Sequence, residues 1–343
     1  MATDTHLELP GLDLDRLGAW LPATVPGAGA TLSATLIAGG KSNLTYLVTD
    51  GNSSWIVRRP PVGELLATAH DMSREYRMMS ALAPTAVPVP AMYAFCDDAA
   101  VLGAPFYVMA EVDGSPYRRA TELEALGAER TRAISERLVD TLITVHSVDP
   151  ASVGLADFGR PQAFLGRQVE RWHKQFVAAR TRDLPVMEQL YQALAGRVPA
   201  DSAPGIVHGD YRLDNVLFDA GDRPAAVLDW ELSTIGDSLT DLALMVAYGR
   251  LAGSDAGHAV SDVSEAPGFL TEHEIVDRYT AGIDRPLGDF GFYLGLAFFK
   301  VAGIFEGIHY RYVNGQTVGD GFSFAGGAVH FLLDAGLNAL KEH

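Results

Sequence analysis

The chain has 343 residues, of which 48% are hydrophobic and 20% are charged, the composition of an ordinary globular protein. Asp and Glu number 43 against 26 Lys and Arg, and a net charge of −17 argues against nucleic acid or an anionic membrane surface as a partner. The length exceeds that of one compact core, so two lobes are expected. The single cysteine, Cys96, excludes an internal disulfide framework and fits a reducing compartment.

The N-terminus and the apolar runs bear on localisation. The first ten residues are acidic and have neither a basic region nor an apolar stretch, so they predict no secretory signal. The longest apolar run, Phe290 to Phe299, is too short to span a bilayer and ends at Lys300. We therefore expect a cytoplasmic protein without a membrane partner.

The first third of the chain is rich in β-strand patterns. Residues 1 to about 30 carry many Pro, Gly and Ala and predict only a helical turn and a loop. Strands are then expected over Thr31–Ile37, Leu44–Thr49, Trp55–Arg59 and Pro105–Val112. Thr68–Leu82 has the apolar spacing of an amphipathic helix.

Helical patterns dominate the remainder of the chain. Helices are expected over Leu123–Val148, Gln162–Arg180 and Leu239–Tyr248, followed by two or three more after Thr271. The residues from Arg250 to Gly268 are rich in Gly, Ser and Asp and predict a mobile loop. Strands followed by helices predict an α+β fold.

The stretch from Ile206 to Leu242 carries the residues that point to chemistry. Two short apolar runs, Val216–Phe218 and Ala225–Leu228, are separated by turn residues and read as a hairpin. Such a hairpin would bring Asn215, just before its first strand, beside Asp229 at the end of its second. An amide and a carboxylate that converge in this way can hold Mg²⁺.

Asp210 precedes this pair on a loop. It has no Lys or Arg beside it in the sequence, so its carboxylate can accept a proton from a substrate hydroxyl. A base, two metal ligands and little covalent chemistry are the parts of phosphoryl transfer from ATP.

The motif HGDYRLDN at residues 208–215 is similar to the catalytic loop of the aminoglycoside phosphotransferase-like kinases, and LDWE at 228–231 replaces the DFG of protein kinases. The nearest likeness is to the kinase-like branch also found fused to acyl-CoA dehydrogenases, and it covers Gly39 to about Tyr312. The resemblance implies a two-lobed protein-kinase-like fold, with a small β-rich N-lobe over 1–112 and a larger, mainly helical C-lobe over 113–343. It also implies ATP and Mg²⁺ as cofactors.

The resemblance implies where the nucleotide would lie. The segment between the first two strands would cover the phosphates, and its contacts would come from Gly39, Gly40, Ser42 and Asn43. A plain hairpin turn would explain that segment equally well. At the hinge between the lobes Met109 would be the gatekeeper, and the Ala110 carbonyl and the Val112 amide would meet adenine.

Kinases place a lysine on the strand here written Trp55–Arg59, but the four lysines of this chain are at positions 41, 174, 300 and 341. Strand alternation puts Arg58 on one face with Ile56, and Arg58 is therefore preferred as the replacement, with Arg59 as the second choice. Glu75 lies on the apolar face of the next helix, where a carboxylate is costly unless it meets a cation. We expect an Arg58–Glu75 ion pair; an exposed glutamate is the alternative.

Other polar residues near the motif have less certain roles. His208 is expected to orient the loop, and Asp241 to anchor the loop backbone. Arg212 could contact a phosphate or a neighbouring carboxylate, and Asp237 could support the loop or touch substrate. The pattern does not choose between these alternatives.

Two sets of charges bear on the acceptor. An acidic set could receive a polycationic aminoglycoside; it comprises Asp255, Asp262, Glu265, Glu272 and Glu274. A basic set would repel an aminoglycoside and match carboxylates and phosphates; it comprises Arg118, Arg119, Arg167, Arg171 and Lys174. Together with the likeness to the branch fused to acyl-CoA dehydrogenases, the basic set favours a hydroxyacyl or other anionic acceptor.

The expected enzyme is thus a small-molecule kinase that phosphorylates an alcohol group. Asp210 would be the base, Arg58 and Glu75 would set the phosphates, and Asn215 and Asp229 would hold the metal. The alternatives are a non-catalytic nucleotide-binding pseudokinase, in which the missing lysine marks lost turnover, and an aminoglycoside kinase. A protein kinase is disfavoured because no long activation segment follows the second metal ligand. The oligomeric state and the choice between ATP and GTP stay open.

Overall fold

The computed structural model describes residues 9–37, 43–62, 71–200, 202–254, 257, 260–283, 285–316 and 324–342. The chain divides into two compact units. The first comprises Met1–Gly114 and Ala225–Ser233, and the second comprises Ser115–Pro224 and Thr234–His343.

The segment Ala225–Ser233 differs from the expected division, which placed it in the second lobe. Its backbone is held within the first unit, where the Val227 N–H donates to the Pro88 carbonyl at 2.8 Å. Its Asp229 carboxylate pairs with Arg58. The two units are therefore not two uninterrupted halves of the chain.

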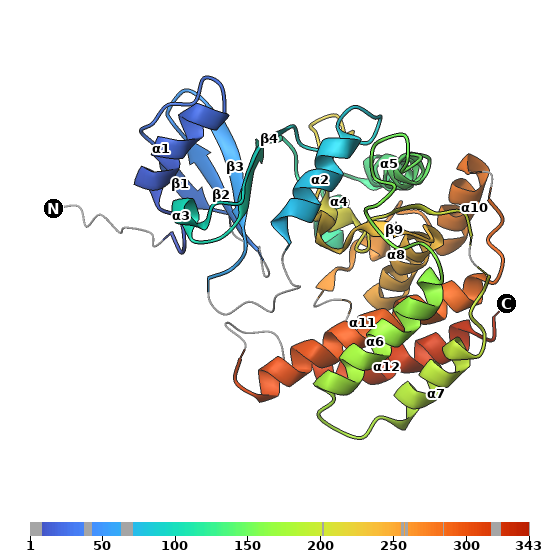
Figure 1. Ribbon diagram of the computed structural model, residues 1–343. Coiled ribbons are helices and arrows are strands. Elements are labelled where there is room, and N and C mark those ends of the chain that lie inside the picture. Colours follow the sequence, from blue (N-terminus) through green and yellow to red (C-terminus); the bar gives the residue numbers. More distant parts are fainter. Residues whose placement is uncertain are drawn as a thin grey trace. The chain divides into compact units, whose positions relative to one another are not determined.

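The first unit is built on a five-stranded antiparallel sheet in the order β1-β2-β3-β5-β4 (Figure 1). The strands are β1 (Ser33–Leu36), β2 (Leu44–Thr49), β3 (Ser54–Arg59), β4 (Met92–Cys96) and β5 (Phe106–Ala110). The expected strands are present, whereas β4 was not anticipated. The helices are α1 (Leu14–Thr24), α2 (Met72–Leu82) and the short α3 (Ala99–Leu102).

Strand alternation gives the sheet two different faces. One face carries Trp55 and Val57 and packs against Leu17 and Leu21 of α1, which is a full helix where only a turn was expected. The other face carries Ile56 and Arg58, because successive side chains point to opposite sides. On the face with Arg58, Tyr107 lies opposite Arg58 and donates its hydroxyl to Glu75 of α2.

The second unit is mainly helical. Its helices are α4 (Ala120–Glu124), α5 (Ala128–His146), α6 (Phe164–Ala179), α7 (Pro185–Ala195), α8 (Leu239–Ala252), α10 (Glu272–Gly282), α11 (Phe290–Val313) and α12 (Ala325–Ala339). The short strands β6 (Gly205–Val207) and β9 (Thr234–Gly236) pair antiparallel. Between them the chain forms the 3-10 turns η1 (Leu213–Asn215) and η2 (Trp230–Leu232) and the strands β7 (Val216–Phe218) and β8 (Pro224–Val227), and η3 (Val263–Glu265) follows α8.

Three expected boundaries were wrong. The single helix expected over Leu123–Val148 is broken into α4 and α5 at Gly127, whose φ of +88° is rare for any residue with a side chain. Helix α2 begins at Met72, after the cap Asp71, and the earlier part of its expected range lies outside the described residues. The expected loop at Arg250–Gly268 begins inside α8 and contains η3.

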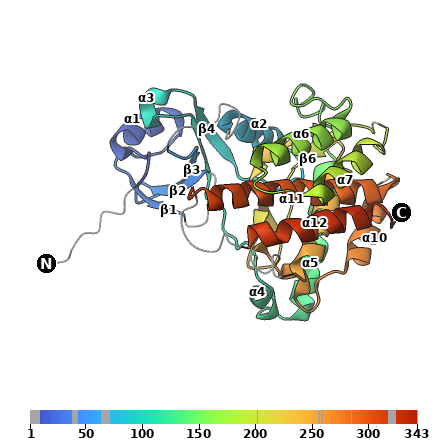
Figure 2. The same ribbon diagram turned by 90° about the horizontal axis from the view of Figure 1, so that it is seen from below.

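Helix α11 forms the core of the second unit. It packs against α12, α6, α8 and α7, and Figure 2 shows α11 and α12 side by side. By length and composition alone α11 could cross a membrane, but 78% of its most apolar window is buried inside the protein. Such burial is typical of a core helix.

Candidate active site

In the first unit, Arg58 joins two carboxylates. Its Nη2 lies 2.6 Å from Asp229 Oδ1, and its Nε lies 3.2 Å from Glu75 Oε2. The Glu75 side chain is 1% exposed, so the expected ion pair forms and the alternative of an exposed glutamate is wrong. Burial disfavours the charge of Arg58, but Tyr107, Glu75 and Asp229 nearby raise its pKa above the usual value, so the guanidinium stays charged.

Tyr107 and Asn43 complete the surroundings of Glu75. The Tyr107 hydroxyl donates to Glu75 Oε2 at 2.9 Å, and the Asn43 amide donates to Glu75 Oε1 at 3.1 Å. The same amide lies 3.2 Å from Glu231 Oε2. Asn43, predicted to touch the nucleotide, is thus engaged with carboxylates through its nitrogen. Tyr107 was missed, although it is directly opposite Arg58 in the β3–β5 register.

Asp229 has a backbone conformation that few residues adopt. Its φ and ψ are 64° and 57°, in the left-handed region, where a side chain other than glycine costs on the order of 1–3 kcal/mol. Oxygens of Asp229, Glu75 and Glu231 lie within 4.8 Å of one another. Carboxylate oxygens are the ligands that Mg²⁺ prefers, so Asp229 and Glu231 fit a cation beside Arg58. The sequence reasoning missed Glu231, which follows Asp229 by two positions.

Arg59, the second choice for the lysine replacement, has a structural role. It is 4% exposed, and its guanidinium donates to the carbonyls of Pro60, Gly11 and Leu102. A buried cation satisfied by three backbone oxygens holds loops together and is not available to a phosphate.

The remaining nucleotide contacts stay predictions. Gly39, Gly40 and Ser42 lie outside the described residues. Met109 is buried in β5 opposite Ile56, on the same face of the sheet as Arg58. The Ala110 N–H donates to the Ala91 carbonyl at 2.8 Å, and Val112 follows the strand.

In the second unit Asp241 holds the backbone of the loop at residues 208–215, the predicted catalytic loop. The N–H groups of His208 and Gly209 donate to its carboxylate at 2.6 and 2.8 Å. Burial opposes the charge of this carboxyl, but the hydrogen bond and charge of His146 lower its pKa below the ordinary value. The predicted anchoring role of Asp241 is confirmed.

The backbone of Gly209 and the side chain of His208 determine the position of Asp210. Gly209 has φ of +87°, which suits glycine alone, and buried His208 accepts the Asp210 N–H through Nδ1 at 3.2 Å. The predicted role of His208 is thus confirmed. The Asp210 carboxylate receives the Tyr248 hydroxyl at 3.3 Å and the Asn215 amide at 3.2 Å.

Asn215 uses its nitrogen for the loop, because Nδ2 also donates to the Asp210 carbonyl at 2.8 Å. Its oxygen is therefore the atom that a metal ion would take. Asn215 belongs to the second unit and Asp229 to the first, so their convergence on one metal ion stays a prediction.

The structure shows protein partners for Arg212 and Asp237, while a contact of either with phosphate or substrate stays a prediction. Arg212 pairs with Asp214, the carboxylate alternative, and its guanidinium lies 4.8 Å from the centre of the Tyr248 ring. Asp237 is buried and accepts from Arg285 at 2.6 Å and from Tyr293 at 2.8 Å. Asp237 therefore supports the fold.

Lys300 brings a cation to the loop of Asp210, which has no Lys or Arg beside it in the sequence. This residue of α11 donates from Nζ to the Gly209 carbonyl, although 91 positions separate the two in sequence. Its ammonium also lies 5.6 Å from the centre of the Trp172 ring. Burial lowers the pKa of Lys300, while Asp210 and Asp241 act in the opposite direction. No local pattern in the sequence could have revealed this contact.

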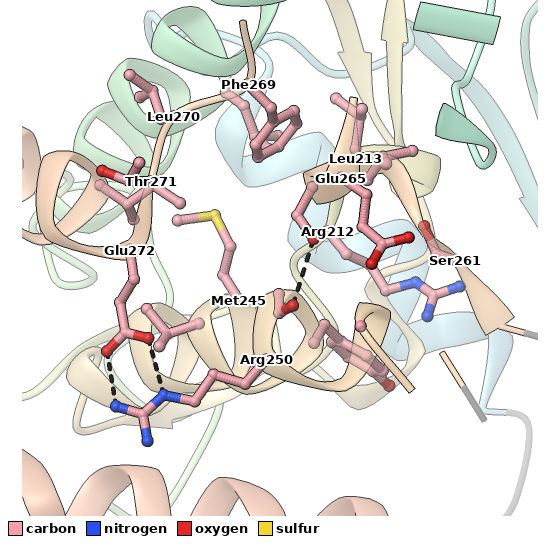
Figure 3. Close-up of a pocket in the computed structure, with 18 residues that line it drawn as sticks. Arg212, Leu213, Met245, Arg250, Ser261, Glu265, Phe269, Leu270, Thr271 and Glu272 are labelled. Atoms are coloured by element: carbon pink, nitrogen blue, oxygen red, sulfur yellow. Dashed lines mark hydrogen bonds and ion pairs between the residues drawn. The ribbon is translucent and has the colours of Figure 1, made fainter. Parts of the chain in front are cut away.

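A cavity of about 320 Å³ adjoins the loop within the second unit (Figure 3). Arg212 and Tyr248 are among its lining residues, with others from α8 and from residues 261–275. No pattern in the sequence predicted this cavity.

Comparison with known proteins was made on the whole chain. A family model described as "Phosphotransferase enzyme family" matches residues 33–269. Acyl-CoA dehydrogenase family member 11 of Rattus norvegicus is 36% identical over 339 residues, which make up 96% of this chain and 43% of that protein. The chain thus spans less than half the length of this relative.

Two solved structures are similar. A provisionally named aminoglycoside phosphotransferase of Ralstonia eutropha JMP134 is 33% identical, with a TM-score of 0.84 and coverage of 96% of this chain and 98% of that one. A thermostable mutant of aminoglycoside phosphotransferase APH(4)-Ia, in ternary complex with AMP-PNP and hygromycin B, has a TM-score of 0.63 at 14% identity and coverage of 93% and 98%. The latter shows the fold alone. The predicted α+β, protein-kinase-like fold and the predicted family resemblance are confirmed.

Proposed function

The chain belongs to the phosphotransferase enzyme family, and from this premise we propose that it transfers the γ-phosphoryl group of ATP to a hydroxyl of a small molecule, with Mg²⁺ as cofactor. The observation that carries most weight is the bridge from Arg58 to Glu75 and Asp229. It supplies the cation that phosphates need and a buried carboxylate that fixes it, the pairing that kinases obtain from lysine and glutamate.

The proposed roles follow from the contacts within each unit. The oxygen of the acceptor hydroxyl bonds to the γ-phosphorus of ATP while Asp210 receives the hydroxyl proton. The bond between the γ-phosphorus and the oxygen that bridges to the β-phosphorus breaks, and ADP leaves. Arg58 stabilises the charge that develops on the phosphates. Asp229 and Asn215 would hold Mg²⁺, which neutralises phosphate charge when bound.

We further propose that the acceptor is anionic, a hydroxyacyl compound or similar metabolite. Three described members of the acidic set are engaged with named groups: Ala120 donates its N–H to Asp262, Arg250 pairs with Glu272, and Arg132 pairs with Glu274. The fourth, Glu265, lines the cavity. Among the described residues, Arg171 and Lys174 of the basic set have no ion-pair partner. An acidic pocket for an aminoglycoside thus has less support than a site for an anion.

A non-catalytic nucleotide-binding module is the second candidate, because arginine replaces the usual lysine. Asp210 bears on this choice. Its carboxylate is positioned by Tyr248 and Asn215, although ATP binding alone needs no base.

The experiment measures release of ADP with Mg-ATP and two acceptor panels at matched concentration, hydroxyacyl compounds including their CoA thioesters, and kanamycin-like aminoglycosides. We expect turnover on the acyl panel and little on the aminoglycosides. Turnover confined to the aminoglycosides would reject the anionic acceptor. ATP binding without turnover on either panel would favour the non-catalytic module.

A further inference from the structure

The cavity in the second unit has mostly apolar walls. It lies between the C-terminal half of α8, the catalytic loop and residues 261–275 (Figure 3). Its apolar lining includes Leu138, Leu213, Met245, Phe269, Leu270 and Ile275. Pockets with mostly apolar walls and a few polar groups are typical of sites for small molecules.

The charges at one end of the cavity are already neutralised. Figure 3 draws Arg250 with two contacts to Glu272, at 2.8 and 2.7 Å. Arg250 also donates to the Glu342 carboxylate at 3.0 and 2.8 Å. Because Arg250 pairs with both Glu272 and Glu342, no net positive charge is left at this end for an anionic ligand.

The opposite end is polar and adjoins the proposed base. Arg212 lines the cavity and pairs with Asp214 through Nη2, but within the described part of the chain its buried Nε has no hydrogen-bond partner. A buried N–H donor without an acceptor costs about 1–3 kcal/mol, so a ligand oxygen is favoured at this end. Tyr248, stacked on Arg212, donates to the Asp210 carboxylate.

We infer that this cavity binds the aliphatic chain of the acceptor, with an oxygen of the ligand at Arg212 Nε. That the ligand is the acceptor rests on the proposed function. That the ligand carries an aliphatic chain rests on the lining of the cavity. The volume equals that of about ten water-sized groups of ~30 Å³ each, so it suits a chain of medium length. An aminoglycoside, polar on all sides, would leave its hydroxyl and amino groups unpaired against these walls.

Gly249 offers a way to fill the cavity without breaking the fold. It lies in α8 and lines the cavity, and an added Cβ would meet only Ser264, at 4.0 Å. Gly249→Ala and Gly249→Leu therefore fill the space in two steps, and both residues favour a helix more than glycine does. Gly327→Leu is the matched control, because Gly327 is exposed in α12 and its added Cβ would meet nothing within 4 Å.

The test measures binding of octanoate and octylamine by calorimetry, without nucleotide. We expect the parent and Gly327→Leu to bind octanoate alike, Gly249→Ala to bind it less well, and Gly249→Leu at least tenfold less well than the parent. Octylamine should bind more weakly than octanoate to the parent, because its ammonium cannot accept the Arg212 Nε–H, although Glu265 also lines the cavity. Equal affinity of the parent and Gly249→Leu for octanoate, or no binding to the parent, overturns the inference.

A second measurement separates this inference from the proposed function. If octanoate binds as expected and no hydroxylated acceptor is phosphorylated, the cavity assignment holds and the kinase proposal fails. If acceptors are phosphorylated with a KM that does not change with chain length or with Gly249→Leu, the kinase proposal holds and the cavity assignment fails.

Discussion

Arg58 differs from the lysine of most kinases in having several nitrogens to share. Nη2 contacts Asp229 and Nε contacts Glu75, so two nitrogens of one planar group each meet a different carboxylate. A lysine would have to contact both carboxylates with its single nitrogen. Arg58 thus offsets with one positive charge part of the negative charge of both acids. A bound metal ion would compete with it for Asp229.

Replacement of Arg58 tests this role. Arg58→Ala should cost on the order of 2–4 kcal/mol of transition-state stabilisation, the loss of one preorganised donor, and Arg58→Lys should recover part of it. The measurement is kcat/KM for Mg-ATP in the presence of acceptor. Unchanged kinetics in Arg58→Ala would contradict the assignment. Arg59→Ala is no silent control, because Arg59 is buried among three carbonyls and its loss should lower Tm.

Lys300 gives a second prediction at the scale of one residue. Its ammonium holds the carbonyl of Gly209, next to the base, so Lys300→Met should lower kcat roughly 10- to 100-fold, the equivalent of one charge-assisted hydrogen bond of about 1.5–3 kcal/mol. The KM for ATP should stay near the parent value. Lys341→Met, an exposed change beyond the end of α12, is the control. Equal kcat in the two variants would remove Lys300 from the loop's support.

Single residues could be predicted where the periodicity of their own strand or helix places them, and not where a contact between distant parts of the chain does. Arg58 and Glu75 were predictable because strand and helix periodicity puts each on a defined face. Tyr107 could have been found from the alternation of β5, where it precedes Met109 by two positions. Lys300 could not, since its contact depends on the packing of α11 against the loop.

At the scale of elements, the N-terminal turn of α8 holds the backbone of the predicted catalytic loop in place. Asp241 accepts two backbone N–H groups from the loop while buried, so Asp241→Asn should destabilise the protein by about 1.5–3 kcal/mol, the worth of hydrogen bonds to a charged group.

The pH dependence of this effect follows from the lowered pKa of Asp241. The unfolded carboxyl titrates near 3.9 and the folded one below it, so the contribution is complete above that range and is lost as pH falls through the folded pKa. Unfolding by denaturant at pH 7 and below pH 3 checks this: the variant and the parent should differ at pH 7 and converge in acid. A difference that stays constant with pH would contradict it.

The helices and strands themselves were largely predictable from apolar periodicity, since α6 and β2 lie close to their expected bounds. The break between α4 and α5 was not, because a glycine in a helical pattern is tolerated in some helices and ends others. Strand β4 was missed because its five residues closely follow Pro84, Pro88 and Pro90, and prolines mark connecting segments.

At the scale of the whole molecule, the proposed site residues are divided between the two units. Arg58, Glu75 and Asp229 belong to the first unit, while Asp210, Asn215 and Lys300 belong to the second. Chain length and the family resemblance predicted two units, but the return of Ala225–Ser233 to the first depends on contacts with Pro88 and Arg58 that no local pattern encodes.

The central claim is that this chain transfers a phosphoryl group to a hydroxyl, with Asp210 as the base. The most direct measurement is phosphorus-31 NMR of the parent and Asp210→Asn, each with Mg-ATP and a hydroxyacyl acceptor, with nucleotide binding measured by calorimetry beside it. The parent should form ADP and a phosphomonoester signal, and Asp210→Asn should bind ATP as the parent does and form neither. A phosphomonoester from Asp210→Asn at the parental rate, or none from the parent with any hydroxylated acceptor, would contradict the account.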